Sequence, residues 1–438
     1  MDTPICDFAR DYGSKDNIRL HMPGHKGKNQ LGVEHLDITE IDGADSLYEA
    51  SGIIQKSEEN ASRLFGCPTF YSTEGSSQCI RAMLYLAVLW AKERGKPPVI
   101  AAGRNAHKTF LTGAALLDLD VRWLYPKNGG SYLSCNLTPE AVEAALEQET
   151  PTAVYLTSPD YLGNVADIAG IAEVCHRHGT LLLVDNAHGA YLKFLGPSRH
   201  PMDLGADLCC DSAHKTLPVL TGGAYLHCTP EFQSWAKNAL ALFGSTSPSY
   251  LILQSLDGAN PGLAWLADRL KEFVPRVNAV KKKLTEQGFV LYGQEPLKIT
   301  LSAKPYGYTG RELSQYLLQR NIVSEFADPD FLVLMLTPEN GQAALDALET
   351  ALLTIPRRTP ISEKPPVFSP CQRVYSPRDA MLSPMETVPV AESEGRILAA
   401  ATVGCPPAVP IVVSGERIDA HAIDCFRYYG TTHCSVMK

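Results

Sequence analysis

The chain alternates short apolar runs with segments of helical spacing, most clearly between residues 60 and 230. The apolar runs, which we predict to be strands, are 97–103, 121–126, 152–158, 180–188, 206–212 and 223–228. Between them, residues 138–149 and 168–179 repeat apolar positions three and four apart, as an amphipathic helix does. Strands that alternate with helices predict an α/β domain with a mostly parallel sheet. Ligands bind such sheets beyond the carboxyl ends of the strands, so we expect functional residues there.

The pattern changes after residue 270. We predict four parts: a large domain with its N-terminal segment at 1–270, a small α+β domain at 271–355, a proline-rich linker at 356–370 and a short C-terminal domain at 371–438. Within the small domain, Thr309 and Glu312 have the spacing of a capping box, which predicts a helix start there.

Composition narrows the class of protein. The 39 basic and 48 acidic residues give a formal net charge of −9, and the densest basic run is only Lys281–Lys283, so nucleic acid and anionic membranes are disfavoured as partners. The 12 cysteines form no C-x-x-C pair, and we predict no metal site. No apolar leader opens the chain, and the longest apolar stretch, near 82–91, is too short to span a bilayer. We therefore expect reduced thiols in a cytoplasmic protein.

Lys215 is the most unusual residue of the predicted large domain. It stands in CCDSAHKTLPVLTGGAYLH (209–227), which otherwise resembles buried core. Burying an ammonium is costly unless it is paired or loses its charge. A neutral lysine amine is suited to form an imine with a carbonyl, either of a substrate or of pyridoxal phosphate (PLP). The alternative is a lysine whose charged end reaches solvent.

Two further candidates follow the run 180–188. Asp185 ends the sequence LLLVD, where a carboxylate can hold a proton on a pyridine nitrogen or, alternatively, cap the next turn. His188 lies three residues later and either orients a neighbouring side chain or is an ordinary core histidine.

Other candidates precede these along the chain. Gly75, Ser76 and Ser77 open a predicted helix, and glycine with two hydroxyls at a helix N-terminus suits a phosphate, although serine is also a common helix cap. His107 follows the run 97–103 and can stack on a flat ring or move a proton, unless it is a surface loop histidine. The acidic segment 37–50 either attracts a cation or is a solvated loop.

Taken together, these residues supply a phosphate site, a ring-stacking imidazole, a partner for a pyridine nitrogen and an imine-forming lysine. They occur in that order, each at the end of an apolar run. A PLP enzyme needs this set of groups.

With these residues, the sequence resembles the ornithine/lysine/arginine decarboxylase family, whose large domain has the aspartate-aminotransferase-type fold. The segments that carry the resemblance are LHMPGHKG (20–27), DITEIDGADSLYEASGII (37–54), TEGSS (73–77), GRNAHKT (103–109), VDNAHGAY (184–191), DSAHKTLPVLTGGAYLH (211–227), STSPSYLILQSLD (245–257), SPRDAMLSPMETVP (376–389) and PPAVPIVVSGERI (406–418). PGHKG, the histidine–lysine segment and the two tail segments separate this family from aminotransferases in general. The resemblance makes 1–270 a PLP-binding domain and 371–438 a decarboxylase-type C-terminal domain.

The resemblance also implies roles for individual residues. Lys215 matches the lysine joined to PLP, Asp185 the partner of the ring nitrogen, and His107 the histidine stacked on the ring. These three are our predicted catalytic residues. The predicted cofactor-binding residues are Gly75, Ser76, Ser77, His107, Asp185, His188, Ser212, His214, Lys215 and Thr246. Thr246 falls where the family reaches the phosphate of a neighbouring subunit, which implies a homodimer or a higher homo-oligomer with a shared active site.

The implied activity is decarboxylation of arginine, lysine or ornithine to the corresponding amine and CO2, as in polyamine biosynthesis. Glu325 and the acidic segment 37–50 are candidates for recognising the distal cation of the substrate. The alternatives are another PLP reaction such as transamination, a non-catalytic regulatory protein of this fold, and a cofactor-free lysine of the aldolase type.

The sequence departs from the family pattern at several points. Asn186 replaces the glutamate that usually follows the aspartate, and Asp160 stands where many members have threonine. The chain is shorter than most members, and we expect no N-terminal wing domain of the kind that large bacterial members carry.

Overall fold

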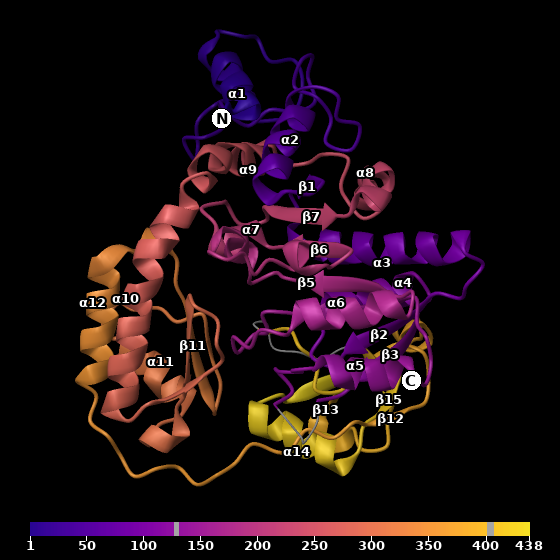
Figure 1. Cartoon of the computed structure of the whole chain (residues 1–438), viewed down its shortest axis with the longest axis vertical. Coiled ribbons are helices and arrows are strands. Elements are labelled where there is room, and N and C mark those ends of the chain that lie inside the picture. Colours follow the sequence, from indigo (N-terminus) through magenta and orange to yellow (C-terminus); the bar gives the residue numbers. More distant parts are fainter. Residues whose placement is uncertain (127–130, 401–406) are drawn as a thin grey trace. The chain divides into compact units, whose positions relative to one another are not determined.

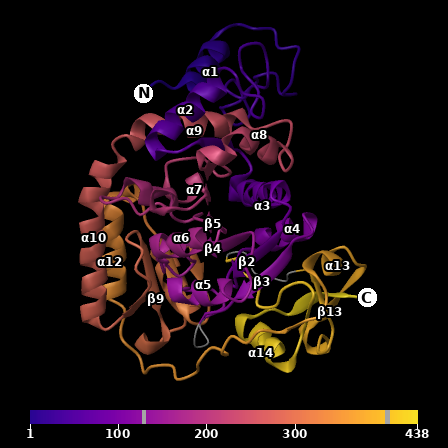
Figure 2. The same ribbon diagram turned by 45° about the vertical axis from the view of Figure 1, so that its right-hand side comes forward.

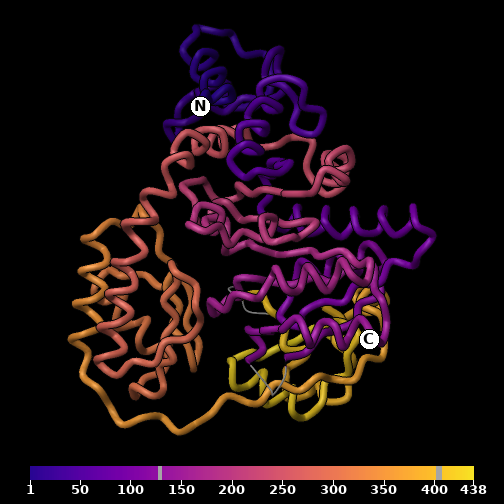
Figure 3. Tube along the Cα trace, viewed as in Figure 1, coloured from indigo at the N-terminus to yellow at the C-terminus, as the bar shows by residue number. Residues whose placement is uncertain are grey.

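The computed structural model describes residues 1–126, 131–400 and 407–438. These residues form two compact units, one of Met1–Lys96 with Leu181–Leu270 and one of Pro97–Thr180 with Lys271–Lys438. Figures 1 and 3 show the path of the chain. Pro406, the first residue of the tail segment 406–418, and residues 401–405 of the predicted C-terminal domain lie outside the described residues.

The first unit places four strands in the order β1-β7-β6-β5. Their bounds are β1 Thr69–Ser72, β5 Leu181–Asp185, β6 Leu208–Asp211 and β7 Ala224–Cys228. β5 and β6 are parallel, whereas β7 is antiparallel to both β6 and β1. The strands form because their apolar residues are buried, as β5 shows along its whole length.

Helices surround these strands: α1 Pro4–Ser14, α2 Ile53–Phe65, α3 Gly75–Glu93, α7 Ala213–Thr216, α8 Gln233–Ala241 and α9 Tyr250–Leu263 (Figure 1). α3 packs on β6 and β7. Its apolar face is buried as its spacing predicts, through Ile80, Met83, Leu84, Ala87 and Val88. This packing fixes the N-terminus of α3 near the ends of the strands.

The second unit begins with three parallel strands in the order β4-β2-β3, formed by β2 Val99–Gly103, β3 Asp120–Leu124 and β4 Ala153–Thr157. The helices between and after them are α4 Lys108–Leu116, α5 Pro139–Leu146 and α6 Ile168–Arg177. The predicted strands are therefore present in both units, with their ends moved by a few residues. The predicted α/β class with mostly parallel strands is confirmed.

A four-stranded antiparallel sheet follows in the order β10-β11-β9-β8. The strands of this sheet are β8 Val290–Tyr292, β9 Lys298–Ser302, β10 Phe326–Ala327 and β11 Phe331–Met335. The helices of this part of the chain are α10 Leu266–Gln287, α11 Gly310–Leu318 and α12 Gly341–Leu353. α10 and α12 lie side by side in Figures 1 and 2, joined by the Lys283–Glu349 ion pair.

Residues 356–370 contain neither helix nor strand. After them come β12 Gln372–Arg373, α13 Pro377–Met381, β13 Met385–Pro389, β14 Leu398–Ala400, β15 Glu416–Arg417, α14 Ala420–Tyr429 and β16 His433–Met437. β16 pairs with β13 and β14, and β12 pairs with β15. Leu398, Phe426 and Val436 belong to the buried core of this part. Within the described ranges, no helix is both long and apolar enough to cross a bilayer.

The predicted capping box is present at the start of α11. Thr309 Oγ1 accepts the Glu312 N–H at 3.2 Å, and Glu312 Oε2 accepts the Thr309 N–H at 2.7 Å. Replacing Thr309 by alanine should therefore lower the free energy of unfolding by about 1 kcal/mol, measured as a shift of the urea midpoint. Thr309→Ser keeps the acceptor oxygen and should unfold like the parent. Equal midpoints for the alanine variant and the parent would contradict this role.

Candidate active site

Lys215 lies on the short helix α7, directly beyond the carboxyl end of β6. Its Nζ is 3.0 Å from Nε2 of His188, whose side chain is buried with 5% exposure. The lysine end is thus half-buried against an imidazole that follows the neighbouring strand β5. His188 is therefore both a buried histidine and a neighbour of the Lys215 amine.

Asp185 is the last residue of β5 and is 2% exposed. Its Oδ1 accepts the Ala187 N–H at 3.2 Å and the Cys210 thiol at 3.6 Å. Asp185 therefore caps the turn that follows it. The chain turns there, so β5 ends at residue 185 and not at residue 188 as predicted. Because β5 and β6 are parallel neighbours, Asp185 and the segment that carries Lys215 leave the sheet at the same edge.

The N-terminus of α3 has room beside it. Gly75 has a φ of +70°, and a Cβ added there would meet no atom within 4 Å. The Ser212 hydroxyl donates to Ser76 Oγ at 2.8 Å, so the start of α3 is joined to the residue before α7. Ser76 and Ser77 are half-buried in the first turn of this 19-residue helix. Backbone N–H groups and hydroxyls in this arrangement suit an anion.

Thr246 is exposed in the loop between α8 and α9. The preceding residue, Ser245, donates its N–H to Glu74 Oε1 at 2.6 Å, which holds this loop against the start of α3. Glu74 belongs to the predicted segment TEGSS, but the sequence offered no signal for its contact with Ser245, because these residues are far apart in the chain.

His214 uses one ring nitrogen internally. Nδ1–H donates to the Gly223 carbonyl at 2.9 Å, and burial lowers the pKa of the ring. In its neutral form Nε2 is unprotonated, so this ring can donate to a phosphate only after it gains a proton.

His107 belongs to the second unit, where it forms the N-cap of α4 and its Nδ1 accepts the Thr109 N–H at 3.1 Å. The same loop is attached to the C-terminal segment. Arg104, 3% exposed, donates to the carbonyls of Pro410 and Ile411 at 2.8 and 2.9 Å, and Lys108 N–H donates to Ala408 O. The C-terminal segment therefore positions the loop that carries His107.

The departures from the family pattern have local partners. The buried Asp160 accepts from Ser134 Oγ at 2.6 Å and from Asn164 Nδ2 at 2.7 Å, so it shapes its own loop. Glu325, which is not a departure but a candidate for recognising the distal cation of the substrate, accepts the Tyr161 hydroxyl at 2.9 Å. Asn186 is fully buried.

In the acidic segment 37–50, Asp45 accepts backbone N–H groups of Ser46, Ser51, Gly52 and Ile54. Burial alone would raise the pKa of Asp45, but these bonds outweigh it and the net shift is downward. Asp45 therefore organises the start of α2.

Comparison with known proteins identifies the family. Residues 3–301 match the model of the Orn/Lys/Arg decarboxylase major domain, and residues 368–434 match that of the Orn/Lys/Arg decarboxylase C-terminal domain. The chain belongs to the Orn/Lys/Arg decarboxylase family. Its two matched segments carry the site residues of the first unit, the His107 loop and the tail that holds that loop.

One relative is similar in sequence along most of the chain, and two solved structures share its fold. An arginine decarboxylase of Bacillus subtilis is 28% identical, over 95% of this chain and 91% of its own length. The lysine decarboxylase LdcF of Francisella novicida has the same fold, with a TM-score of 0.81 at 15% identity over 100% of this chain and 81% of that one. A structure of SPT with PLP bound as an internal aldimine has a TM-score of 0.58 at 12% identity, over 81% of this chain and 83% of that one.

Proposed function

We propose that this protein is a PLP-dependent decarboxylase that converts arginine, lysine or ornithine into the corresponding amine and CO2. The observation that supports this proposal is the position of Lys215, Asp185 and the Ser76–Ser212 pair at one edge of the parallel strands β5 and β6. Within a decarboxylase family, this is the set of groups that the reaction requires.

The residues of the first unit fit the cofactor. Lys215 offers the amine that would hold its aldehyde, and the buried Asp185 would face its ring nitrogen. The open space at Gly75, with the hydroxyls of Ser76 and Ser212, would take the phosphate. When bound, PLP supplies an electron-accepting ring that stabilises the carbanion left by CO2 loss.

The chain's own groups then have distinct tasks. Asp185 would keep a proton on the ring nitrogen, since a buried carboxylate beside that nitrogen would favour the cationic form. Lys215 would supply the proton that the substrate carbon takes up after CO2 loss, and His188 Nε2, 3.0 Å from its Nζ, would orient this amine. By the family resemblance, His107 would stack on the ring, and the phosphate contacts would fix that ring so that the scissile bond is held in one orientation.

Further parts of the proposal follow from the family. Thr246 reaches the phosphate site of a second copy, which makes the active enzyme a homodimer or larger. We place the activity in polyamine metabolism in the cytoplasm. Thr246 is exposed, so its side chain is accessible to a second copy of the chain.

The test is an assay of purified protein with arginine, lysine and ornithine. We expect a yellow protein that releases CO2 and forms the amine of one of the three substrates. Formation of a keto acid without CO2 would instead indicate transamination, and a colourless protein that binds no PLP would contradict the proposed function.

A further inference from the structure

A fully buried polar cluster lies behind the candidate site in the first unit. It consists of Asp211, His200, His227 and Asn186, each 0% exposed. Asp211 Oδ2 is 3.1 Å from Nε2 of both histidines, and Asp211 Oδ1 accepts the Asn186 amide at 2.6 Å. None of these contacts involves a residue that the proposed reaction uses directly.

Hydrogen bonds fix the protons of the cluster. His200 Nδ1 accepts the Met202 N–H at 3.4 Å, so His200 donates from Nε2 to Asp211. Burial lowers the pKa of His227, whose Nδ1 lies 2.9 Å from the Thr69 hydroxyl. Burial alone would raise the pKa of Asp211, but the two imidazoles outweigh it and the net shift is downward. Asp211 is therefore an ionised carboxylate. It accepts from His200 Nε2, from the Asn186 amide and from the Cys209 thiol at 3.9 Å, and His227 Nε2 lies 3.1 Å from its Oδ2.

This arrangement favours a hydrogen-bonded cluster over a metal site. Ligand atoms of His200, Cys209 and Asp211 lie within 4.8 Å of one another, as metal ligands do. However, His200 Nε2 carries a proton toward Asp211, and the Asp211 oxygens already accept N–H groups. A metal ligand must present a lone pair instead.

Two residues of the cluster are next in sequence to two of the predicted cofactor-binding residues, Asp185 and Ser212. Asn186 directly follows Asp185. Asp211 directly precedes Ser212, and Ser212 lies three residues before Lys215 on α7. The Asn186 N–H also donates to the Cys210 carbonyl at 3.0 Å. The side-chain bond from Asn186 to Asp211 thus joins the ends of β5 and β6 where the site residues begin.

We infer that Asp211 is a positioning residue, which acts through Asn186 to fix the carboxylate at 185 relative to the amine at 215. His200 and His227 keep Asp211 ionised and oriented. That this positioning serves catalysis rests on the proposed function. That the Asn186–Asp211 bond joins the ends of β5 and β6 does not depend on the proposed function.

Three variants separate positioning from general stability. Asn186→Ala removes the bond between the strand ends but leaves Asp211 with both histidines. Asp211→Asn removes the negative charge but allows the hydrogen bonds to be kept. The oxygen of the new amide can accept from the imidazoles, and its NH2 can donate to Asn186 Oδ1. In the described part of the chain, Asn186 Oδ1 is a buried atom with no hydrogen-bond partner. Thr69→Val is the matched control, since it disturbs the cluster at His227, on the side away from Asn186.

Hydrogen exchange of the cofactor-free protein gives the first measurement. Asn186→Ala should lower the protection of amides 186–187 and 211–215 by about tenfold, the effect of losing one hydrogen bond to a charged group. Asp211→Asn should lower this protection less than Asn186→Ala does, because a neutral hydrogen bond replaces the charged one, and Thr69→Val should leave these amides near parental protection. Unchanged protection in Asn186→Ala would overturn the inference even if the protein never binds PLP.

PLP titration and kinetics of the loaded enzyme give the second measurement. Asn186→Ala should raise the dissociation constant of PLP and lower kcat, each about tenfold, with KM for the amino acid changed less. Thr69→Val should lower the melting temperature without either change. If Asn186→Ala only lowers the melting temperature, as the control does, the cluster is merely structural. Absence of PLP binding in the parent would refute the proposed function instead.

Discussion

Replacing Lys215 by alanine should abolish turnover, with a loss of about 10³-fold or more, as expected when the covalent group of an enzyme is removed. The change removes the amine that would hold the cofactor and the partner of His188 Nε2, which lies 3.0 Å from Lys215 Nζ. The visible absorbance of the lysine-bound cofactor should disappear with the activity. Both are measured on the purified variant after PLP is added in excess.

Lys215→Arg is the matched control for charge. Arginine keeps a cation near His188 but cannot hold the aldehyde in the same way, so we expect it to be as inactive as the alanine variant. Borohydride reduction of the parent, followed by mass spectrometry of its peptides, should place the cofactor on Lys215. Normal activity in Lys215→Ala, or an adduct on another lysine, would refute the assignment.

Much of the fold was predictable because it depends on local patterns. The apolar runs predict the strands, and the rule that ligands bind at strand ends predicts functional residues where Asp185 and Lys215 lie. The capping box at Thr309 was equally local, since both partners lie within one helical turn. Where a side chain's partner is close in sequence, spacing alone identifies it.

The parts that sequence reasoning missed depend on long-range register. Asn186 and Asp211 are 25 residues apart, and Asp211 and His227 are 16 apart. They meet only because β6 pairs with β5 on one side and with β7 on the other, which brings their same-face side chains together. Glu74 and Ser245 meet for a similar reason, through packing of α3 and α8. A single sequence contains no signal for these pairs.

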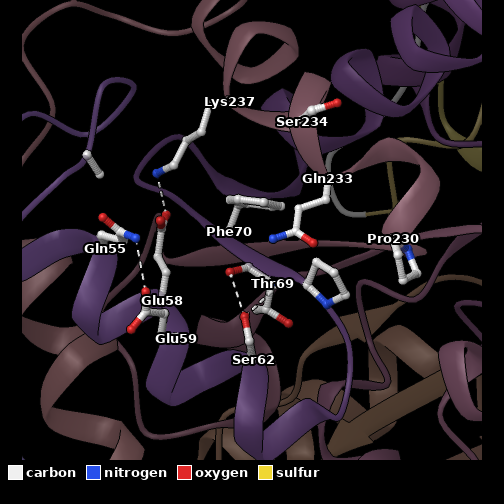
Figure 4. A pocket seen from close by; sticks show the side chains of 12 residues that line it. Gln55, Glu58, Glu59, Ser62, Thr69, Phe70, Pro230, Gln233, Ser234 and Lys237 are labelled. Atoms are coloured by element: carbon white, nitrogen blue, oxygen red, sulfur yellow. Dashed lines mark hydrogen bonds and ion pairs between the residues drawn. The ribbon is translucent and has the colours of Figure 1, made fainter.

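A buried ion pair in the first unit allows a prediction that is independent of the proposed function. Lys237 Nζ on α8 lies 2.5 Å from Glu58 Oε1 on α2, and Glu58 Oε1 also accepts the Tyr71 N–H at 2.9 Å. Figure 4 shows the pair among the side chains that line a pocket, with Phe70 and Gln233. The volume of this pocket is about 490 Å³. The Glu58 side chain is 6% exposed and that of Lys237 is 19% exposed, so water reaches mainly the lysine.

Replacing Lys237 by methionine should lower the free energy of unfolding by roughly 3 kcal/mol, the lower end of the range for breaking a buried pair, because a buried carboxylate loses its cation. Lys237 also donates to the Leu47 carbonyl, which adds to the loss. The measurement is the urea midpoint. Lys237→Met combined with Glu58→Gln should recover most of the stability, since the amide needs no counter-charge.

The stability that Lys237→Met loses should also depend on pH. Burial raises the pKa of Glu58 even beside Lys237, and removal of the lysine raises that pKa further. A carboxyl with a raised pKa binds its proton more tightly in the folded state, so its contribution to stability is present below its unfolded pKa and is lost as pH rises through the folded pKa. The stability difference between parent and Lys237→Met should therefore be larger at about pH 8 than at about pH 5, and the double variant should remove this dependence. Equal losses at both pH values would show that Lys237 contributes by packing and by its bond to Leu47, not by neutralising Glu58.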